Sequence, residues 1–273
     1  MRQKSSKIWK ILSRILIVLS LLFFYLPIFY IILFSFNSKK SLSDFGGFSL
    51  RWYLDPQEGL FNSDPMMSAL GYTILVAVVA TLVSTVLGTI TAIGLSKTGK
   101  HLRHAVERVN EIPVMNPDIV TGISLLMLFS GLAVPKGLWT MMLAHIMFCT
   151  PFVILSVMPK LRALDPNLTD AALDLGCTPF QAMTKVIIPQ IRTGIIAGAL
   201  IAFTMSFDDF VISYFVTGEG VQNISILVYS MRARIDPTIN ALSSIVILII
   251  TVSLLAINLI PLIRRKAKGI SAK

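Results

Sequence analysis

Long apolar stretches separated by polar connections recur along the whole chain. Six of them reach the roughly 20 residues that a helix needs to cross the hydrocarbon core of a bilayer. Their approximate bounds are 12–36, 70–95, 112–133, 137–158, 193–217 and 241–263. The pattern predicts an all-α, polytopic membrane protein with six transmembrane helices.

The polar connections divide the chain into four regions. Residues 1–36 hold the N-terminus and the first span, which no small-residue cleavage site follows, so we expect it to remain as a helix. Residues 37–68 form an external connection in which we expect a short surface helix. Residues 69–263 form one core of five spans, and residues 264–273 form a basic tail.

The composition and the placement of charge support this reading. The chain is 55% hydrophobic and only 14% charged, a balance typical of membrane proteins. Most of its 24 lysines and arginines lie before residue 15, in the connections at 97–108 and 160–192, and in the tail. Because cationic connections stay on the cytoplasmic side, both termini and the connection at 160–192 are expected there.

The net charge of +10 therefore reports orientation and an attraction to anionic lipid headgroups. A protein that binds nucleic acid would need a basic surface on one domain. Here the basic residues are spread over four separate segments, so we expect the lipid bilayer, and no nucleic acid, as a partner.

The cysteines and histidines show no pattern of metal or redox chemistry. Cys149 lies in the fourth span and Cys177 in a connection, so the two should be at different levels and unable to form a disulfide. His101 and His104 lie in a basic connection, and His145 lies alone in a span. The sequence has no phosphate-binding loop and no nucleophile motif. We expect no enzyme activity, metal or cofactor in this chain; if ATP and Mg are used, a partner ATPase binds them.

Signals that start and end helices are concentrated between the fourth and fifth spans. Asp165, followed by a proline, predicts the start of a short helix, and Gly176 predicts its left-handed end. Thr178 and Pro179 predict a second short helix, which Pro189 should terminate. Two short helices joined at a glycine would form a rigid projection at the membrane surface, which we call the knob (residues 165–189).

Three carboxylates lie inside the apolar stretches: Asp118 in the third span, and Asp208 with Asp209 in the fifth. A charge at the centre of a span disfavours insertion by about 2.5 to 3.5 kcal/mol, so these groups should face protein or water. Adjacent helical residues point about 100° apart, so one of the pair should line a route and the other should bond to a neighbouring helix or subunit. Asp118 follows Asn116 and a proline, so a capping role and a substrate contact both stay open.

Aromatic side chains accompany the carboxylate pair, among them Phe207 and Tyr214. Aromatic faces attract ammonium groups, and a carboxylate offsets their desolvation, so the combination suits an elongated organic cation. A structural reading, with core aromatics around a polar network, stays open. Gly194 and Gly198 fit either a close packing seam between helices or glycines without a contact role.

The knob resembles the EAA loop of permeases in importers of the ATP-binding-cassette (ABC) type. Asp170 stands in place of the usual glutamate, and Ile188 in place of the usual leucine; both changes keep charge or apolarity. The resemblance implies a cytoplasmic coupling loop at 160–191, which docks on the ATPase. The coupling residues that it implies are Asp170, Ala171, Ala172, Gly176, Pro179 and Pro189.

The stretches 206–218 (SFDDFVISYFVTG) and 117–125 (PDIVTGISL) narrow the resemblance to PotC-type permease subunits of spermidine/putrescine importers. The likeness covers essentially the whole chain. It implies the type I (MetI-like) importer fold, a bacterial cytoplasmic membrane, and transport of polyamines by alternating access. The pathway candidates are Asp208, Asp209, Phe207, Tyr214 and Asp118.

The implied partners are a PotB-like second permease, two PotA-like ATP-binding subunits and a PotD-like external polyamine-binding protein. One alternative keeps this architecture and changes the solute to an amino acid, an opine-like compound or ferric iron. A second alternative is a channel or scaffold without ATP coupling, which would have no use for a docking loop.

Overall fold

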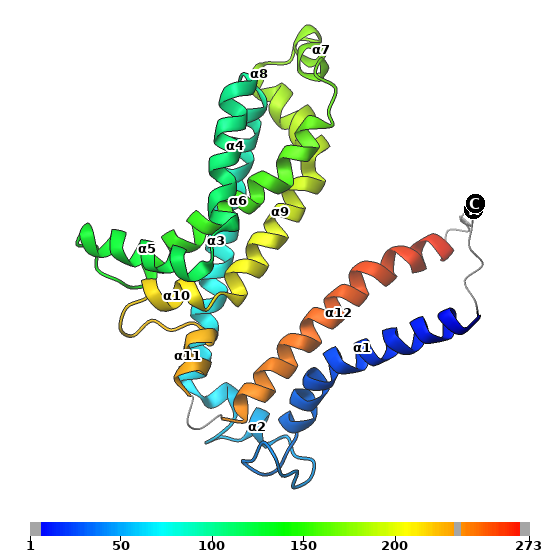
Figure 1. The fold of residues 1–273 in the computed structure, drawn as a ribbon, viewed down its shortest axis with the longest axis vertical. Coiled ribbons are helices and arrows are strands. Elements are labelled where there is room, and N and C mark those ends of the chain that lie inside the picture. Colours follow the sequence, from blue (N-terminus) through cyan, green and yellow to red (C-terminus); the bar gives the residue numbers. More distant parts are fainter. Residues whose placement is uncertain (1–6, 232–235, 268–273) are drawn as a thin grey trace. The chain divides into compact units, whose positions relative to one another are not determined.

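The computed structural model describes residues 7–231 and 236–267, and within these ranges the chain is helical and has no β-strand (Figure 1). The predicted all-α class is confirmed. The predicted cytoplasmic residues 1–6 and tail residues 268–273 lie outside the described residues. In chain order the elements are α1 (Lys7–Ser35), α2 (Arg51–Leu54), η1 (Leu60–Asn62), α3 (Asp64–Ser96), α4 (Lys100–Met115), α5 (Asp118–Gly131), α6 (Leu138–Arg162), α7 (Leu168–Asp174), α8 (Pro179–Gln181), η2 (Ala182–Ile187), α9 (Ile188–Asp208), α10 (Val211–Val216), α11 (Ile224–Ser230) and α12 (Thr238–Ala267). Of these, η1 is a 3₁₀ turn and η2 is a π-helical turn.

The chain forms two compact units. One comprises the residues before Ser68 together with those after Ser230, and the other comprises Ser68–Ser230. In the first unit, α1 packs against α12, and α12 also contacts α2 and η1. The most apolar window of α1 is otherwise entirely exposed in this single chain.

The connection between α1 and α3 is organised around Asn37. The indole Nε1 of the fully buried Trp52 donates to the backbone oxygen of Asn37 at 2.6 Å. The Asn37 side-chain amide donates to the backbone oxygens of Ser41 and Asp44, each at 2.9 Å. The short helix expected in this connection is α2, so that prediction is confirmed.

The centre of the second unit is the pair α6 and α9, which lie side by side (Figure 1). A Cβ added at Gly194 would lie 2.9 Å from the backbone oxygen of Ser156, and one added at Gly198 would lie 3.1 Å from the Cα of Val153. Only glycine lets the two backbones approach this closely. The packing seam at Gly194 and Gly198 is therefore confirmed, and the reading without a contact role is wrong.

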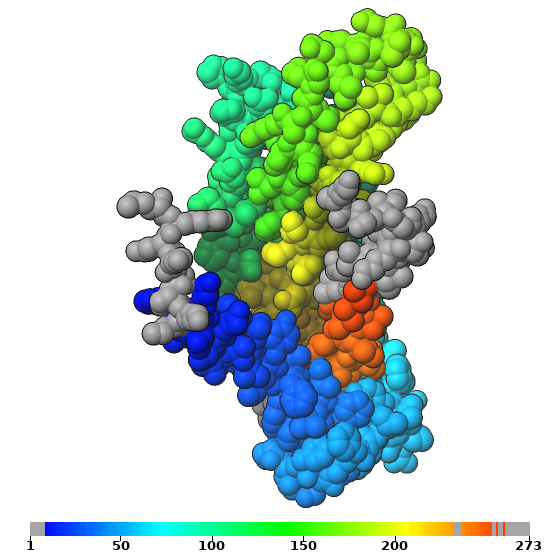
Figure 2. All heavy atoms as spheres, turned by 90° about the vertical axis from the view of Figure 1, so that its right-hand side faces the viewer, coloured from blue at the N-terminus to red at the C-terminus, as the bar shows by residue number. Residues whose placement is uncertain are grey.

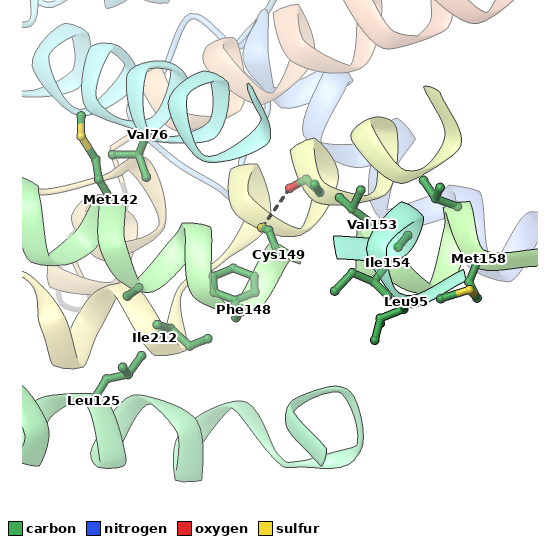
Figure 3. Packing of buried hydrophobic residues seen from close by; sticks show 14 of the residues in the cluster. Val76, Leu95, Leu125, Met142, Phe148, Cys149, Val153, Ile154, Met158 and Ile212 are labelled. Atoms are coloured by element: carbon green, nitrogen blue, oxygen red, sulfur yellow. Dashed lines mark hydrogen bonds between the residues drawn. The ribbon is translucent and has the colours of Figure 1, made fainter. Parts of the chain in front are cut away.

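The hydrophobic core of the second unit follows α6 (Figure 3). Phe148 of α6 lies beside Ile212 of α10, and the thiol of Cys149 donates to the backbone oxygen of Ala202 in α9 at 3.4 Å. Cys149 and Cys177 are both free, as the sequence predicted.

The third predicted span, 112–133, is not one straight helix. α4 ends at Met115, α5 begins at Asp118, and the two meet at an angle of 103°. Pro117 disfavours a helical conformation at Asn116, whose ψ is 137°, so the helix must break there. α5 then packs against α10.

The fifth predicted span, 193–217, also differs from the structure. α9 ends at Asp208, Asp209 is extended with φ −67° and ψ 127°, and the chain turns into the separate helix α10. At its other end the same helix starts earlier than expected, since Pro179–Asp208 is continuous through η2. The break at Asp209 lies inside one apolar stretch, so hydropathy did not reveal it. The earlier start lies in residues 179–192, whose lysine, arginine and glutamines placed them outside the predicted span.

Four helices within the described ranges are long and apolar enough to cross a membrane singly, and the bent pair of α4 and α5 could make a fifth span. The sixth predicted span, 241–263, coincides with α12, in which the apolar stretch found is shorter, Thr238–Val252. The chain is a multi-pass membrane protein, and its third predicted span is interrupted between α4 and α5.

Candidate functional site

The predicted knob is present at one end of the second unit (Figure 1). Gly176 has φ +84°, a value that side chains with a Cβ disfavour. Its N–H donates to the oxygen of Leu173 at 2.9 Å, and the N–H of Cys177 donates to that of Ala172 at 3.1 Å. These two bonds form a Schellman motif, so the predicted left-handed end of the first short helix is confirmed.

The start of that helix was predicted incorrectly. α7 begins at Leu168 after Asn167, not directly after Asp165. The Asp165 carboxylate accepts from the Asn167 N–H at 2.9 Å and so closes a turn before the helix.

The second short helix starts as predicted and continues further than predicted. Thr178 Oγ1 accepts from the N–H of Gln181 at 3.3 Å, and Gln181 Oε1 accepts from the N–H of Thr178 at 3.0 Å, which is a complete capping box. Pro189 does not end the helix. The turn before it widens to the π form, in which the N–H of Ile188 bonds to Met183, so the missing proline N–H and the bulk of the ring are accommodated without a break.

The knob is the yellow-green projection in the space-filling view of Figure 2, and large apolar side chains are exposed at its tip. Ala172 is buried against the following turn, whereas Asp170 and Gly176 are exposed. Leu175 is 86% exposed and Phe180 is 77% exposed. These two side chains are not among the predicted coupling residues, although large apolar residues on either side of a surface glycine indicate a contact surface.

A cavity of about 320 Å³ lies at the far end of α9 from the knob, within the same unit. It brings together Asp118, from the start of α5, with Asp208 and Asp209, from the end of α9. Phe207 and Tyr214 are not among its lining residues. The full lining is Asp118, Phe148, Thr204, Met205, Asp208, Asp209, Phe210, Val211 and Ile212.

The three carboxylates differ in their surroundings. Asp118 and Asp208 are exposed, and neither has a hydrogen bond or ion pair with any residue that the structure describes. Asp118 is the first residue of α5, where a negative charge suits the helix dipole, and none of the described hydrogen bonds joins its carboxylate to the helix end. The Asp209 side chain is only 7% exposed, and its oxygens accept from the N–H of Ile212 at 3.2 Å and of Ser213 at 2.7 Å.

The two aromatic candidates lie beside the cavity. Tyr214 belongs to a group of rings with Phe210 and Tyr229, at centroid distances of 4.7 to 5.6 Å. Phe210 also lines the cavity, so this aromatic group adjoins the carboxylates. Phe207 stacks instead on Phe203, at 5.7 Å.

Beneath Asp209 lies a buried histidine that sequence reasoning dismissed. His145 is 1% exposed; its Nδ1 lies 2.7 Å from Ser206 Oγ, and its Nε2 lies 2.9 Å from Ser213 Oγ and 3.4 Å from Asp209 Oδ2. The sequence did contain a signal for this polar cluster, because an ionisable side chain such as His145 inside a span needs polar partners. Its partners come from helices 60 to 70 positions further along the chain, which the sequence pattern does not reveal.

Residues 84–268 match the family model described as binding-protein-dependent transport system inner membrane component. The chain is 37% identical to the putrescine transport system permease protein PotI of Escherichia coli K12, over 88% of this chain and 85% of that protein. It is 35% identical to the spermidine/putrescine transport system permease protein PotC of the same strain, over 90% of this chain and 92% of that protein.

Solved structures of other importers share the fold. A chain of a bacterial ABC transporter involved in the import of alginate superposes with a TM-score of 0.68 at 16% identity, covering 97% of this chain and 98% of that chain. A chain of the MetNI methionine ABC transporter gives 0.53 at 19% identity, covering 74% and 98%. Since these transporters carry different solutes, the fold alone does not identify the substrate.

Proposed function

This chain belongs to the family of binding-protein-dependent transport system inner membrane components, and we propose that it is the permease subunit of an ABC importer that moves spermidine or putrescine across the bacterial cytoplasmic membrane. In this proposal it catalyses no covalent reaction. Its partners are a second permease, two ATP-binding subunits and an external binding protein.

The observation that carries the substrate class is the meeting of Asp118 and Asp208 in one cavity, without other partners among the described residues. Two unpaired carboxylates in a membrane protein are unfavourable unless water or a cation compensates them. A polyamine supplies several ammonium groups on one flexible chain. Phe210 and the adjoining rings offer faces that attract the same groups.

The knob is proposed to dock on an ATP-binding subunit. The exposed Leu175 and Phe180 would enter an apolar groove, and the exposed Asp170 would lie at its rim. The Schellman motif and the capping box support this role, because they fix the angle between the two short helices and leave the tip rigid.

Coupling to the cavity would use the continuity of Pro179–Asp208. Thirty helical residues span about 45 Å, so one rod connects the knob to the carboxylates. A displacement that ATP binding imposes on the knob would reach Asp208 with little loss, and alternating access would follow from the movement of such rods. We place the route between this chain and the second permease, with α1, whose apolar surface is exposed, against that partner.

The test is uptake by the reconstituted four-component transporter. We expect ATP-dependent accumulation of radiolabelled spermidine or putrescine, and no accumulation of a neutral amino acid or ferric iron. Accumulation of either control solute, without the polyamines, would establish the other solute class. Uptake without ATP would instead favour a channel.

A further inference from the structure

Three polar side chains of the second unit contact one imidazole, and a fourth side chain binds two of these three residues. His145, on α6, contacts Ser206 in the last turn of α9, Ser213 on α10, and Asp209 in the break between those two helices. Asn223, just before α11, donates from Nδ2 to the backbone oxygen of Asp209 at 2.9 Å and to Ser213 Oγ at 3.0 Å. The network therefore ties α6 to both sides of the break.

The chemistry of the partners orients the ring. The Asp209 carboxylate only accepts hydrogen bonds, so the ring hydrogen belongs on Nε2, which faces both that carboxylate and Ser213 Oγ. Nδ1 forms a hydrogen bond with the hydroxyl of Ser206. Every polar atom of the imidazole has a partner in this arrangement, as a buried polar group requires.

The network also explains why adjacent aspartates have different surroundings. The break turns Asp209 inward, where two backbone N–H groups and the imidazole hold its carboxylate. Asp208 remains at the end of α9, exposed in the cavity that Asp118 also lines.

We propose that His145 is a positioning residue: by holding Ser206, Ser213 and Asp209 it fixes the break after α9, and the break places Asp208 in the cavity as the carboxylate that meets the cation. This inference rests on the proposed function only for the role of Asp208. His145 itself touches no substrate.

The experiment measures where residue 208 lies. Asp208→Cys is made in a chain carrying Cys149→Ser and Cys177→Ser, and the complex is assembled with its partner subunits. The rate at which 2-aminoethyl methanethiosulfonate, a small cationic thiol reagent, modifies the new cysteine is then compared with and without His145→Gln, normalised to assembled complex. No polyamine is present, so the result does not depend on which solute is carried.

A matched control is Thr140→Val. Thr140 is fully buried, and its hydroxyl donates to the backbone oxygen of Val216 at 2.8 Å, so it also joins α6 to α10 but lies outside the histidine network. We expect His145→Gln to change the modification rate by about tenfold, the change that corresponds to 1.4 kcal/mol. Thr140→Val should leave the rate unchanged and lower only the yield of complex.

Equal rates in the parent and in His145→Gln would overturn the proposal, and so would a change of the same size in Thr140→Val. If His145→Gln does not assemble, Ser206→Ala decides, because it removes a single hydroxyl from the network. A change in rate with Ser206→Ala supports the positioning role, and an unchanged rate in its assembled complex refutes it.

Discussion

Neutralising the two adjacent aspartates should separate transport from assembly. In Asp209→Asn, the amide keeps one oxygen but places an NH₂ group where the N–H of Ile212 or Ser213 already points. A hydrogen bond to a charged group contributes about 1.5 to 3 kcal/mol, and a buried unsatisfied donor costs about 1 to 3 kcal/mol. The expected loss is therefore about 2.5 to 6 kcal/mol of fold stability.

Asp208→Asn changes an exposed side chain that has no partner among the described residues, so its effect on stability should stay within about 0.5 kcal/mol. Its loss is expected in transport. Removing a charge that compensates an ammonium group in a partly wet site corresponds to about 1 to 3 kcal/mol, or roughly 5- to 150-fold in uptake.

The assay measures three quantities for each variant: the yield of complex that co-purifies with the ATP-binding subunits, its melting temperature in detergent, and polyamine uptake per assembled transporter. Asp209→Asn should lower the first two, and Asp208→Asn only the third. Wild-type uptake per complex in Asp208→Asn would remove that carboxylate from the route. Normal yield and melting in Asp209→Asn would contradict the structural role of its hydrogen bonds.

Four further changes test other parts of the molecule. Gly176→Val should assemble poorly with the ATPase or hydrolyse ATP without transport, since a Cβ at this positive φ costs about 1 kcal/mol or more and tilts the second short helix; normal transport would exclude docking by this loop. Phe180→Ser should weaken co-purification with the ATPase while the permease inserts normally. Gly198→Leu should lower the yield of folded permease, because its side chain would overlap the backbone of α6. Cysteines placed at Ser5 and Ser271 should react with an impermeant reagent only after cells are permeabilised, and labelling in intact cells would reverse the proposed orientation.

The features that the sequence predicted well are those that short-range hydrogen bonds determine. The end of α7 at Gly176 and the capping box at Thr178 each depend on residues within five positions, so local sequence contained them. The glycine seam was one of two open readings until the distances to Ser156 and Val153 were known.

The features that the sequence missed are interruptions within apolar stretches. The bend at Pro117 had a local signal, but the hydropathy of the third stretch outweighed it. The break at Asp209 had none, because it is held by His145 and Asn223 from other elements. At Pro189 the signal was present and misleading, since the π turn lets the helix continue.

The continuous helix Pro179–Asp208 and the break that follows it give one chain two properties. It can transmit a movement along its length, and it can present carboxylates to a cation at its end. The knob and Asp208 are the two ends of one continuous helix, so movement imposed at Gly176 is carried to the cavity. At the cavity the helix Pro179–Asp208 ends. The buried hydrogen bonds of His145 join its last turn to α10. The helix α5, which begins with Asp118, packs on α10. Asp118 and Asp208 therefore belong to one block and should move together. The cation would then be released by separation of this block from the second permease, and the spacing of the two carboxylates would stay constant through the cycle.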